Sequence, residues 1–238
     1  MEKIDVLCDS SSLISLTDSC LDNILGFLAN NFNIRFIIPN SVEDESVNRP
    51  LTSHIRQYSF SALKIKKAIN DNIIVKVKNG QETHPTVDSI LYMTNNMFFV
   101  RGKPLKLVHL GEAEMIALAE ELDVNSILID ERTTRMLIEA PFQLKEHLEE
   151  EFSTNVMVNR DNLTKFSDLT KGMEAIRSTE LLILAYENGY FDGFGEIKRD
   201  VLEAALYKLK FSGCSIRFDE ITDFMKSIMG ETKNAAVP

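Results

Sequence analysis

The chain of 238 residues is poor in cysteine and histidine, with three and four of these residues. The cysteines form no C-x-x-C pair, and their odd number leaves one unpaired in any disulfide scheme, which suits a reducing compartment. The histidines lack the i, i+4 spacing of zinc proteases. The sequence therefore argues against a zinc site.

Long apolar runs are also missing. No stretch of about 18 apolar residues could span a bilayer, and the first residues lack the apolar core of a signal peptide. Hydrophobic residues make up 44% of the chain and charged residues 26%, which is an ordinary globular composition. We expect a soluble, cytoplasmic protein with no membrane partner.

Positive charge is scarce overall but unevenly distributed. The net charge is −10, yet residues 46–110 contain ten Lys/Arg against three acidic residues. Because phosphate attraction is local and short-ranged in salt, such a basic segment is compatible with binding a polyanion on one face. A solvated basic helix explains the same pattern equally well.

Buried strands alternate with amphipathic helices over the first two thirds of the chain. Apolar runs at 4–8, 34–39 and 126–130 predict strands, and residues 12–30, 54–70 and 111–122 predict helices. This order predicts an α/β fold with a parallel sheet. We expect residues 155–158 to complete the sheet and the chain from 162 onward to be helical.

Two acidic residues end buried strands. Asp9 follows the strand 4–8, and Asp130 ends the strand 126–130. The carboxyl ends of parallel strands meet at one edge of a sheet, so these acids should be neighbours, with Glu45 and Glu112 on the connections around the same edge. Taken singly, Asp9 could instead be a helix cap, and Glu112 could be an acid in the first turn of a helix, where the helix dipole stabilises negative charge.

Converging carboxylates favour a hard divalent cation. Like charges raise one another's pKa, and Mg²⁺ or Mn²⁺ bound by oxygen ligands relieves this repulsion. A site of this kind suits phosphodiester hydrolysis by metal-activated water.

Four motifs in order resemble those of the PIN-domain nucleases. "VLCDSSSLISL" is similar to the first PIN motif, and "IIPNSVEDE" to the second motif of one subgroup, with the acid six positions after the proline. "LGEAEMIALAEEL" resembles that subgroup's Gly-Glu helix, and "SILIDERTTRML" its strand, acid pair and arginine. The resemblance covers roughly residues 4–158.

The resemblance implies a three-layer α/β/α sandwich and an Mg²⁺- or Mn²⁺-dependent ribonuclease. Carried over, the acidic quartet is Asp9, Glu45, Glu112 and Asp130, with Ser11 holding the first carboxylate. Glu131 follows Asp130 directly, and which of the two faces the metal is open; we favour Asp130 because it ends the strand.

The expected organisation is a PIN-like domain over 1–160, with a basic, largely helical insert at about 46–110, and a helical extension over 161–238. The insert and the extension are both long for a simple PIN toxin. The extension is expected to pack on the PIN-like domain or on a partner subunit, which leaves open a homodimer or another protein partner.

RNA is the expected substrate, and several basic residues are candidates to bind it. These are Arg132 and Arg135, which follow the acid pair, and Lys64 and Lys67 in the basic segment. Ion pairs with neighbouring acids are the competing interpretation. A non-catalytic RNA-binding or adaptor protein is the alternative function, and a phosphatase with Asp9 as nucleophile is disfavoured because Ser11 stands where such enzymes usually carry a second Asp.

Overall fold

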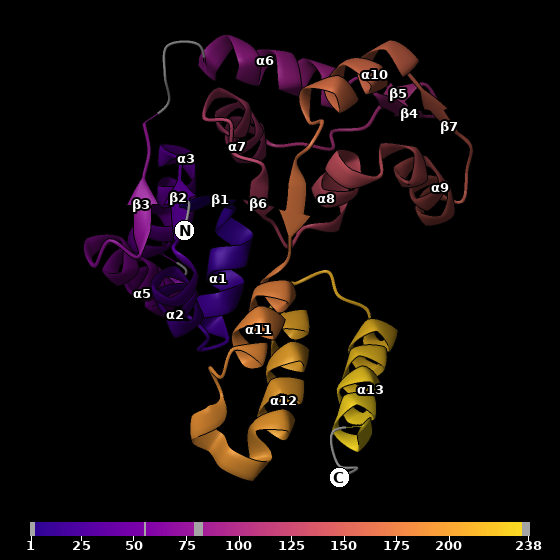
Figure 1. Ribbon diagram of the computed structural model, residues 1–238. Helices are drawn as coiled ribbons and strands as arrows, with labels where there is room; N and C mark the ends of the chain where they lie inside the picture. The colour runs from indigo at the N-terminus through magenta and orange to yellow at the C-terminus, as the bar shows by residue number, and fades with distance from the viewer. Residues whose placement is uncertain (1–2, 55, 79–82, 235–238) are drawn as a thin grey trace.

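A five-stranded parallel sheet forms the centre of the protein in this computed structural model, which describes residues 3–54, 56–78 and 83–234 (Figure 1). The strand order is β3-β2-β1-β6-β8, and every pair is parallel. The strands are β1 (Ile4–Cys8), β2 (Ile34–Ile38), β3 (Ile74–Lys76), β6 (Ser126–Leu128) and β8 (Glu174–Ile176).

Helices cover both faces of this sheet, so the fold is a three-layer α/β/α sandwich. One face, which carries Val6, Phe36 and Leu128, packs against the following helices: α1 (Ser10–Asp18), α2 (Asn23–Phe32), α5 (Ser59–Asn70), α11 (Ser178–Glu187), α12 (Lys198–Phe211) and α13 (Phe218–Asn234). The other face, which carries Leu7 and Ile127, packs against α6 (Thr83–Thr94), α7 (Leu110–Glu121), α8 (Arg132–Glu139), α9 (Pro141–Phe152) and α10 (Arg160–Leu169). Side chains alternate between the two cores because successive strand residues point to opposite faces.

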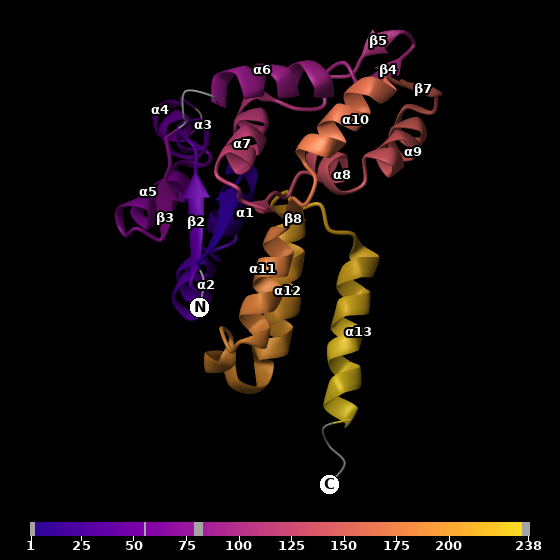
Figure 2. The same cartoon turned by 45° about the horizontal axis from the view of Figure 1, so that its top comes forward.

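Short helical turns connect β2 to α5. They are α3 (Asn40–Glu43), the π-helical turn η1 (Asp44–Asn48) and α4 (Arg49–Thr52). A 3-10 segment, η2 (Asp192–Ile197), joins α11 to α12. In both views α11, α12 and α13 run alongside one another beyond the sheet (Figures 1 and 2).

A second, antiparallel sheet corrects the expectation for residues 155–158. Strand β7 (Val156–Val158) pairs with β4 (Phe98–Val100), which also pairs with β5 (Lys103–Pro104). The central sheet is completed instead by β8, which comes from a region predicted to be wholly helical. The sheet therefore takes its last strand from beyond the predicted boundary at residue 160.

One predicted helix is divided, and the largely helical insert also contributes to the central sheet. The helix expected over 12–30 is divided into α1 and α2, because Cys20 adopts a left-handed conformation with φ 58°. The basic insert contains an edge strand of the central sheet, β3, as well as helices. The structure has no described helix that is both long and apolar enough to cross a membrane.

We predict that a chain ending at residue 160 will not fold. Removing β8 would leave the backbone of β6 unpaired at the sheet edge and expose Ile127, which is fully buried. Circular dichroism and urea denaturation of this fragment and of the full chain test the point. Cooperative unfolding of the fragment would contradict it and would support a boundary at 160.

Candidate functional site

Asp9 lies at the carboxyl end of β1 and caps α1. Its backbone N–H donates to Leu128 O of the neighbouring strand at 2.9 Å, which fixes it at the edge of the sheet. Its carboxylate accepts hydrogen bonds from the Ser11 N–H at 3.0 Å and from the Ser11 hydroxyl. The contact expected between Ser11 and the first carboxylate is therefore present.

The Asp9 carboxylate is almost fully buried, with 7% of the residue exposed. Burial raises its pKa, and the nearby negative charge of Glu45 raises it further, while the bonds from Ser11 act in the opposite direction. A carboxylate in this position is costly unless a cation or a proton offsets its charge.

Glu45 comes to the site from the π-helical turn η1. Its Oε2 accepts a hydrogen bond from the Ser10 hydroxyl at 2.9 Å, and its Oε1 lies 4.0 Å from Arg49 Nη1. A Cβ atom at Gly111 would lie 3.2 Å from Glu45 Oε1, so the glycine lets α7 approach this carboxylate closely. Because Glu112 follows Gly111 directly, the Gly-Glu pair of the sequence motif brings the first turn of α7 close to the Glu45 carboxylate.

Glu112 lies in the first turn of α7 and is held at both oxygens. Oε2 accepts from the His109 N–H and Oε1 from the Thr134 hydroxyl, each at 2.8 Å. Burial raises the pKa of Glu112 to about 7, and the charges of Asp9 and Glu131 contribute in the same direction. Glu112 therefore connects the Asp9 side of the site to the start of α8.

The fourth acid beside Glu112 is Glu131 rather than Asp130. Glu131 caps α8, with its two oxygens accepting from the Thr133 N–H at 2.8 Å and the Thr134 N–H at 2.6 Å. Asp9, Glu45, Glu112 and Glu131 thus interact electrostatically as a row along the sheet edge, which we call the acid row.

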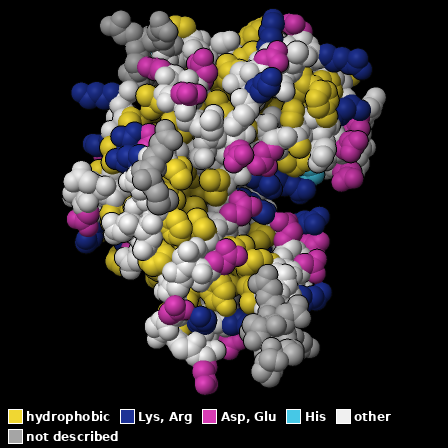
Figure 3. Space-filling view, viewed as in Figure 1, with side chains coloured by type: hydrophobic (Ala, Val, Ile, Leu, Met, Phe, Trp, Pro, Cys, Tyr) yellow, Lys and Arg dark blue, Asp and Glu magenta, His cyan; other side chains and the backbone are white. Residues whose placement is uncertain are grey.

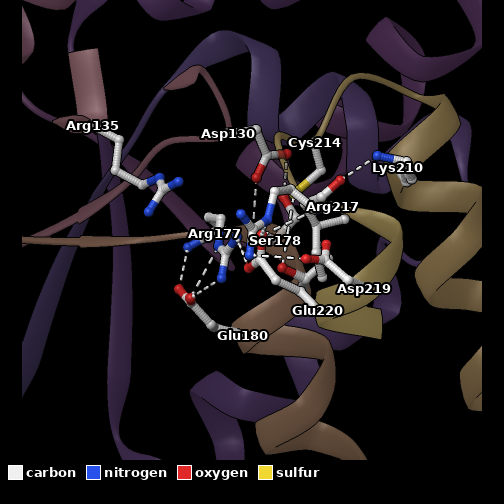
Figure 4. A network of polar contacts seen from close by, with 12 residues as sticks. Asp130, Arg135, Arg177, Ser178, Glu180, Lys210, Cys214, Arg217, Asp219 and Glu220 are labelled. Carbon is white, nitrogen blue, oxygen red and sulfur yellow. Dashed lines mark hydrogen bonds and ion pairs between the residues drawn. The ribbon is translucent and has the colours of Figure 1, made fainter. Parts of the chain in front are cut away.

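The hydrogen bonds of the Asp130 carboxylate are made outside the acid row, with the first residue of α11, and its expected role as a metal ligand stays a prediction. Its carboxylate accepts from the Ser178 N–H and from the Ser178 hydroxyl, each at 2.8 Å, and the residue is 1% exposed (Figure 4). The pairing of β6 with β8 explains this contact, because Leu128 lies opposite Ile176 and the register continues to Asp130 and Ser178. Asp130 thereby joins the sheet to the first turn of α11.

The C-terminal helices reinforce this junction. Ser215 N donates to Asp130 O at 3.1 Å, and Arg177 bridges Glu180 of α11 and Glu220 of α13 at 2.9 Å and 2.8 Å (Figure 4). Burial and the charge of Asp130 raise the pKa of the Cys214 thiol to about 12. Asp130, directly before Glu131, is therefore held by the first residue of α11 and by the loop that precedes α13.

Most of the predicted RNA-binding residues make local ion pairs. Lys64 Nζ lies 2.8 Å from Asp22 Oδ1 and donates to Thr17 O at 3.2 Å. Lys67 pairs with Asp71, and Arg135 with Glu139 at 3.4 Å. Among the residues that the structure describes, Arg132 is exposed and forms no ion pair.

Two hollows flank the acid row and bring in basic residues that the sequence did not single out. Glu112 and Glu131 line a pocket of about 280 Å³ together with Lys106 and His109. Glu45 lines a second pocket of about 280 Å³ together with Arg49 and Tyr58. A polyanion lying across the row would meet a cationic side chain on each side.

The carboxylates of the acid row do not form a preorganised metal-binding site in this structure. Within the described part of the chain, no three His, Cys, Asp or Glu side chains are grouped closely enough to hold a metal ion. The donor set nevertheless consists of carboxylate oxygens, which are the ligands that Mg²⁺ and Mn²⁺ prefer. Burial is the main cause of the raised pKa of both Asp9 and Glu112, and the neighbouring carboxylates raise each pKa further.

In comparisons with known proteins, no family model matches the chain, and no similar curated protein was found.

The raised pKa of Glu112 predicts a pH-dependent stability. The folded protein holds this proton up to a pH of about 7, whereas the unfolded chain releases it near 4.5. The stabilisation is therefore complete below pH 4.5 and is lost as the pH rises through 7, which amounts to roughly 3 kcal/mol. Urea unfolding in a chelator at pH 5 to 8 should show this fall.

Glu112→Gln should remove most of the dependence while keeping the hydrogen bond to the His109 N–H, since Gln also serves in a capping box. The raised pKa of Asp9 acts in the same direction and leaves a residual slope. Glu120→Gln, on the exposed end of α7, is the matched control and should retain the full dependence. An unchanged slope in Glu112→Gln would contradict the assignment.

Proposed function

We propose that this protein is an Mg²⁺- or Mn²⁺-dependent ribonuclease of the PIN-like kind, and that its metal ligands come from Asp9, Glu45, Glu112 and Glu131. The observation that carries the proposal is the acid row at the carboxyl ends of the parallel strands, where open α/β folds bind ligands. The four motifs that resemble the PIN nucleases support the same site from the sequence.

The roles follow from the contacts of each side chain. Asp9 provides the central carboxylate, and Ser11 orients it. Ser10 orients Glu45, while Thr134 and the His109 N–H orient Glu112. A bound divalent cation would supply two kinds of chemistry, a lower pKa for an attacking water and compensation of phosphate charge.

The substrate side of the site is assigned to cations close to the acid row. Arg49 and Lys106 line the two flanking hollows, and Arg132 follows Glu131 directly on α8. Guanidinium and ammonium groups at these positions would bind the phosphates on either side of the scissile bond. Lys64 has a smaller role in this proposal, because it pairs with Asp22 and lines neither hollow, whereas Arg49 pairs with Asp44 at 2.9 Å but lines the hollow beside Glu45.

The alternative is a non-catalytic RNA-binding or adaptor protein on the same scaffold. It is supported by the absence of a preformed three-ligand group in the described residues, and by the backbone N–H bonds that already engage Glu112 and Glu131. Calorimetry with Mn²⁺ separates the two functions. Binding that is lost in Asp9→Asn favours the nuclease, and no binding at pH 8 favours the adaptor.

A pair of neighbouring substitutions tests the assignment of the fourth acid. Glu131→Gln should lower Mn²⁺-dependent cleavage of RNA by roughly 100-fold, as should Asp9→Asn. Asp130→Asn should retain activity within about threefold, because an amide can still accept from the Ser178 N–H and donate to the Ser178 hydroxyl.

Glu120→Gln is the matched control and should cleave at the rate of the unaltered protein. If Asp130→Asn is inactive and Glu131→Gln is active, Asp130 is the ligand and the side-chain arrangement must change when metal binds. If neither substitution alters metal-dependent cleavage, the proposed site is wrong.

A further inference from the structure

A groove runs along the outer strand of the second sheet, between α9 and α10. We call it the edge groove; its volume is about 830 Å³, and it is lined by residues that include Phe98, Phe142, Lys145, Met157, Arg160 and Leu163. None of these residues belongs to the acid row. The function of the groove is therefore a separate question from the proposed nuclease.

Strand β7 presents an unpaired backbone edge to this groove. The order of the second sheet is β5-β4-β7, so β7 has a neighbour on one side only. Leu105 N donates to Phe98 O at 2.9 Å, which turns the backbone of Phe98 toward β5. Val158 lies opposite Phe98, and in an antiparallel ladder its N–H and C=O must then point away from β4.

Val156 confirms the direction of this edge. It lies two residues before Val158 and so presents its backbone to the same side, where its N–H donates to Glu149 Oε1 at 2.9 Å. The strand itself, Val-Met-Val, contains no proline and no charged residue that would shield the edge. Val158 N–H, Val158 C=O and Val156 C=O are therefore oriented to pair with an added strand.

The side chains around the edge define what kind of strand would fit. Phe142 is 73% exposed and Met157 57% exposed, which is unfavourable for large apolar side chains unless a partner covers them. The charged residues that line the groove are Lys145, which pairs with Glu149 at 2.9 Å, and Arg160, for which no ion pair is found within the described part of the chain. Figure 3 shows hydrophobic side chains with charged side chains of both signs around them at the end of the molecule where β7 and α10 lie.

We propose that the edge groove binds an extended peptide segment of a partner protein, which adds to the second sheet beside β7. Backbone hydrogen bonds to Val158 supply affinity, and apolar side chains of the peptide cover Phe142 and Met157. An acidic side chain of the peptide faces Arg160. Two copies of this chain, each with a net charge of −10, would repel one another, which favours a separate peptide over a second copy.

Selection from a random-peptide phage library on the full chain, followed by fluorescence anisotropy with the selected peptides, tests this inference. The selected sequences should combine alternating apolar residues with Asp or Glu. Val158→Pro removes the outward N–H without breaking a bond to β4 and should weaken binding by about tenfold or more. Phe142→Ala should weaken it similarly.

Matched controls distinguish binding in the edge groove from nonspecific hydrophobic binding and from misfolding of a variant. Phe211→Ala removes a side chain that is 75% exposed on α12, outside the groove, and should leave the affinity unchanged. Arg160→Glu should weaken the binding of acidic peptides. It should strengthen the binding of peptides in which the acidic residues are replaced by Lys. Circular dichroism establishes that each variant is folded, and if Val158→Pro is not, Phe142→Ala and Arg160→Glu decide the outcome.

Three results would overturn the inference. They are the failure of selection to yield any peptide sensitive to Phe142→Ala or Arg160→Glu, displacement of the peptides by RNA, and a dimer of the chain alone that dissociates in Val158→Pro when measured by sedimentation. Each result is independent of metal-dependent cleavage, because all measurements are made in a chelator. A failed nuclease assay therefore leaves this inference intact.

Discussion

The burial of the Asp9 carboxylate beside two other acids is the constraint on which the arrangement of the site depends. Asp9 cannot move to solvent, since its backbone is bonded to Leu128 and its side chain caps α1. Glu45 and Glu112 reach it from separate elements, and Gly111 is the position that allows their approach. Serine hydroxyls and helix N-termini lower the cost of the charge but add no positive ion. The protein can resolve this conflict by binding a proton, as the raised pKa of Glu112 indicates, or by binding a cation.

The strand ends and the central carboxylate were predictable from the sequence because they depend on local signals. An apolar run followed by Asp and Ser defines both the end of β1 and the cap of α1. The choice between Asp130 and Glu131 was not local. It depends on β8, whose three residues Glu-Ala-Ile carry too weak a strand pattern to be recognised. Once β8 is known to pair with β6, the register places Ser178 opposite Asp130, and Glu131 is left to face Glu112.

The basic segment shows a different limit of sequence reasoning. Its excess of Lys and Arg is real, but several of the acids that neutralise individual side chains come from other parts of the chain. Lys64 is paired with Asp22 and Lys76 with Glu43, both from before the segment. The cations beside the acid row are Lys106 and Arg49, which itself pairs with Asp44, and they lie near the two ends of the segment. Charge counted along a chain therefore indicates a surface only after the fold has paired its residues.

The late position of β8 has a consequence for the order of events during translation. Strands β1, β2, β3 and β6 all leave the ribosome before residues 174–176 are made, and domains generally fold as their segments emerge. The nascent chain therefore carries all four carboxylates of the acid row at a time when β6 still has an open edge and Asp130 has no Ser178 to bind. The charged groups of the site are thus made before β8 can fix the segment that carries them, and the newly made chain passes through an interval in which the edge of β6 is unpaired.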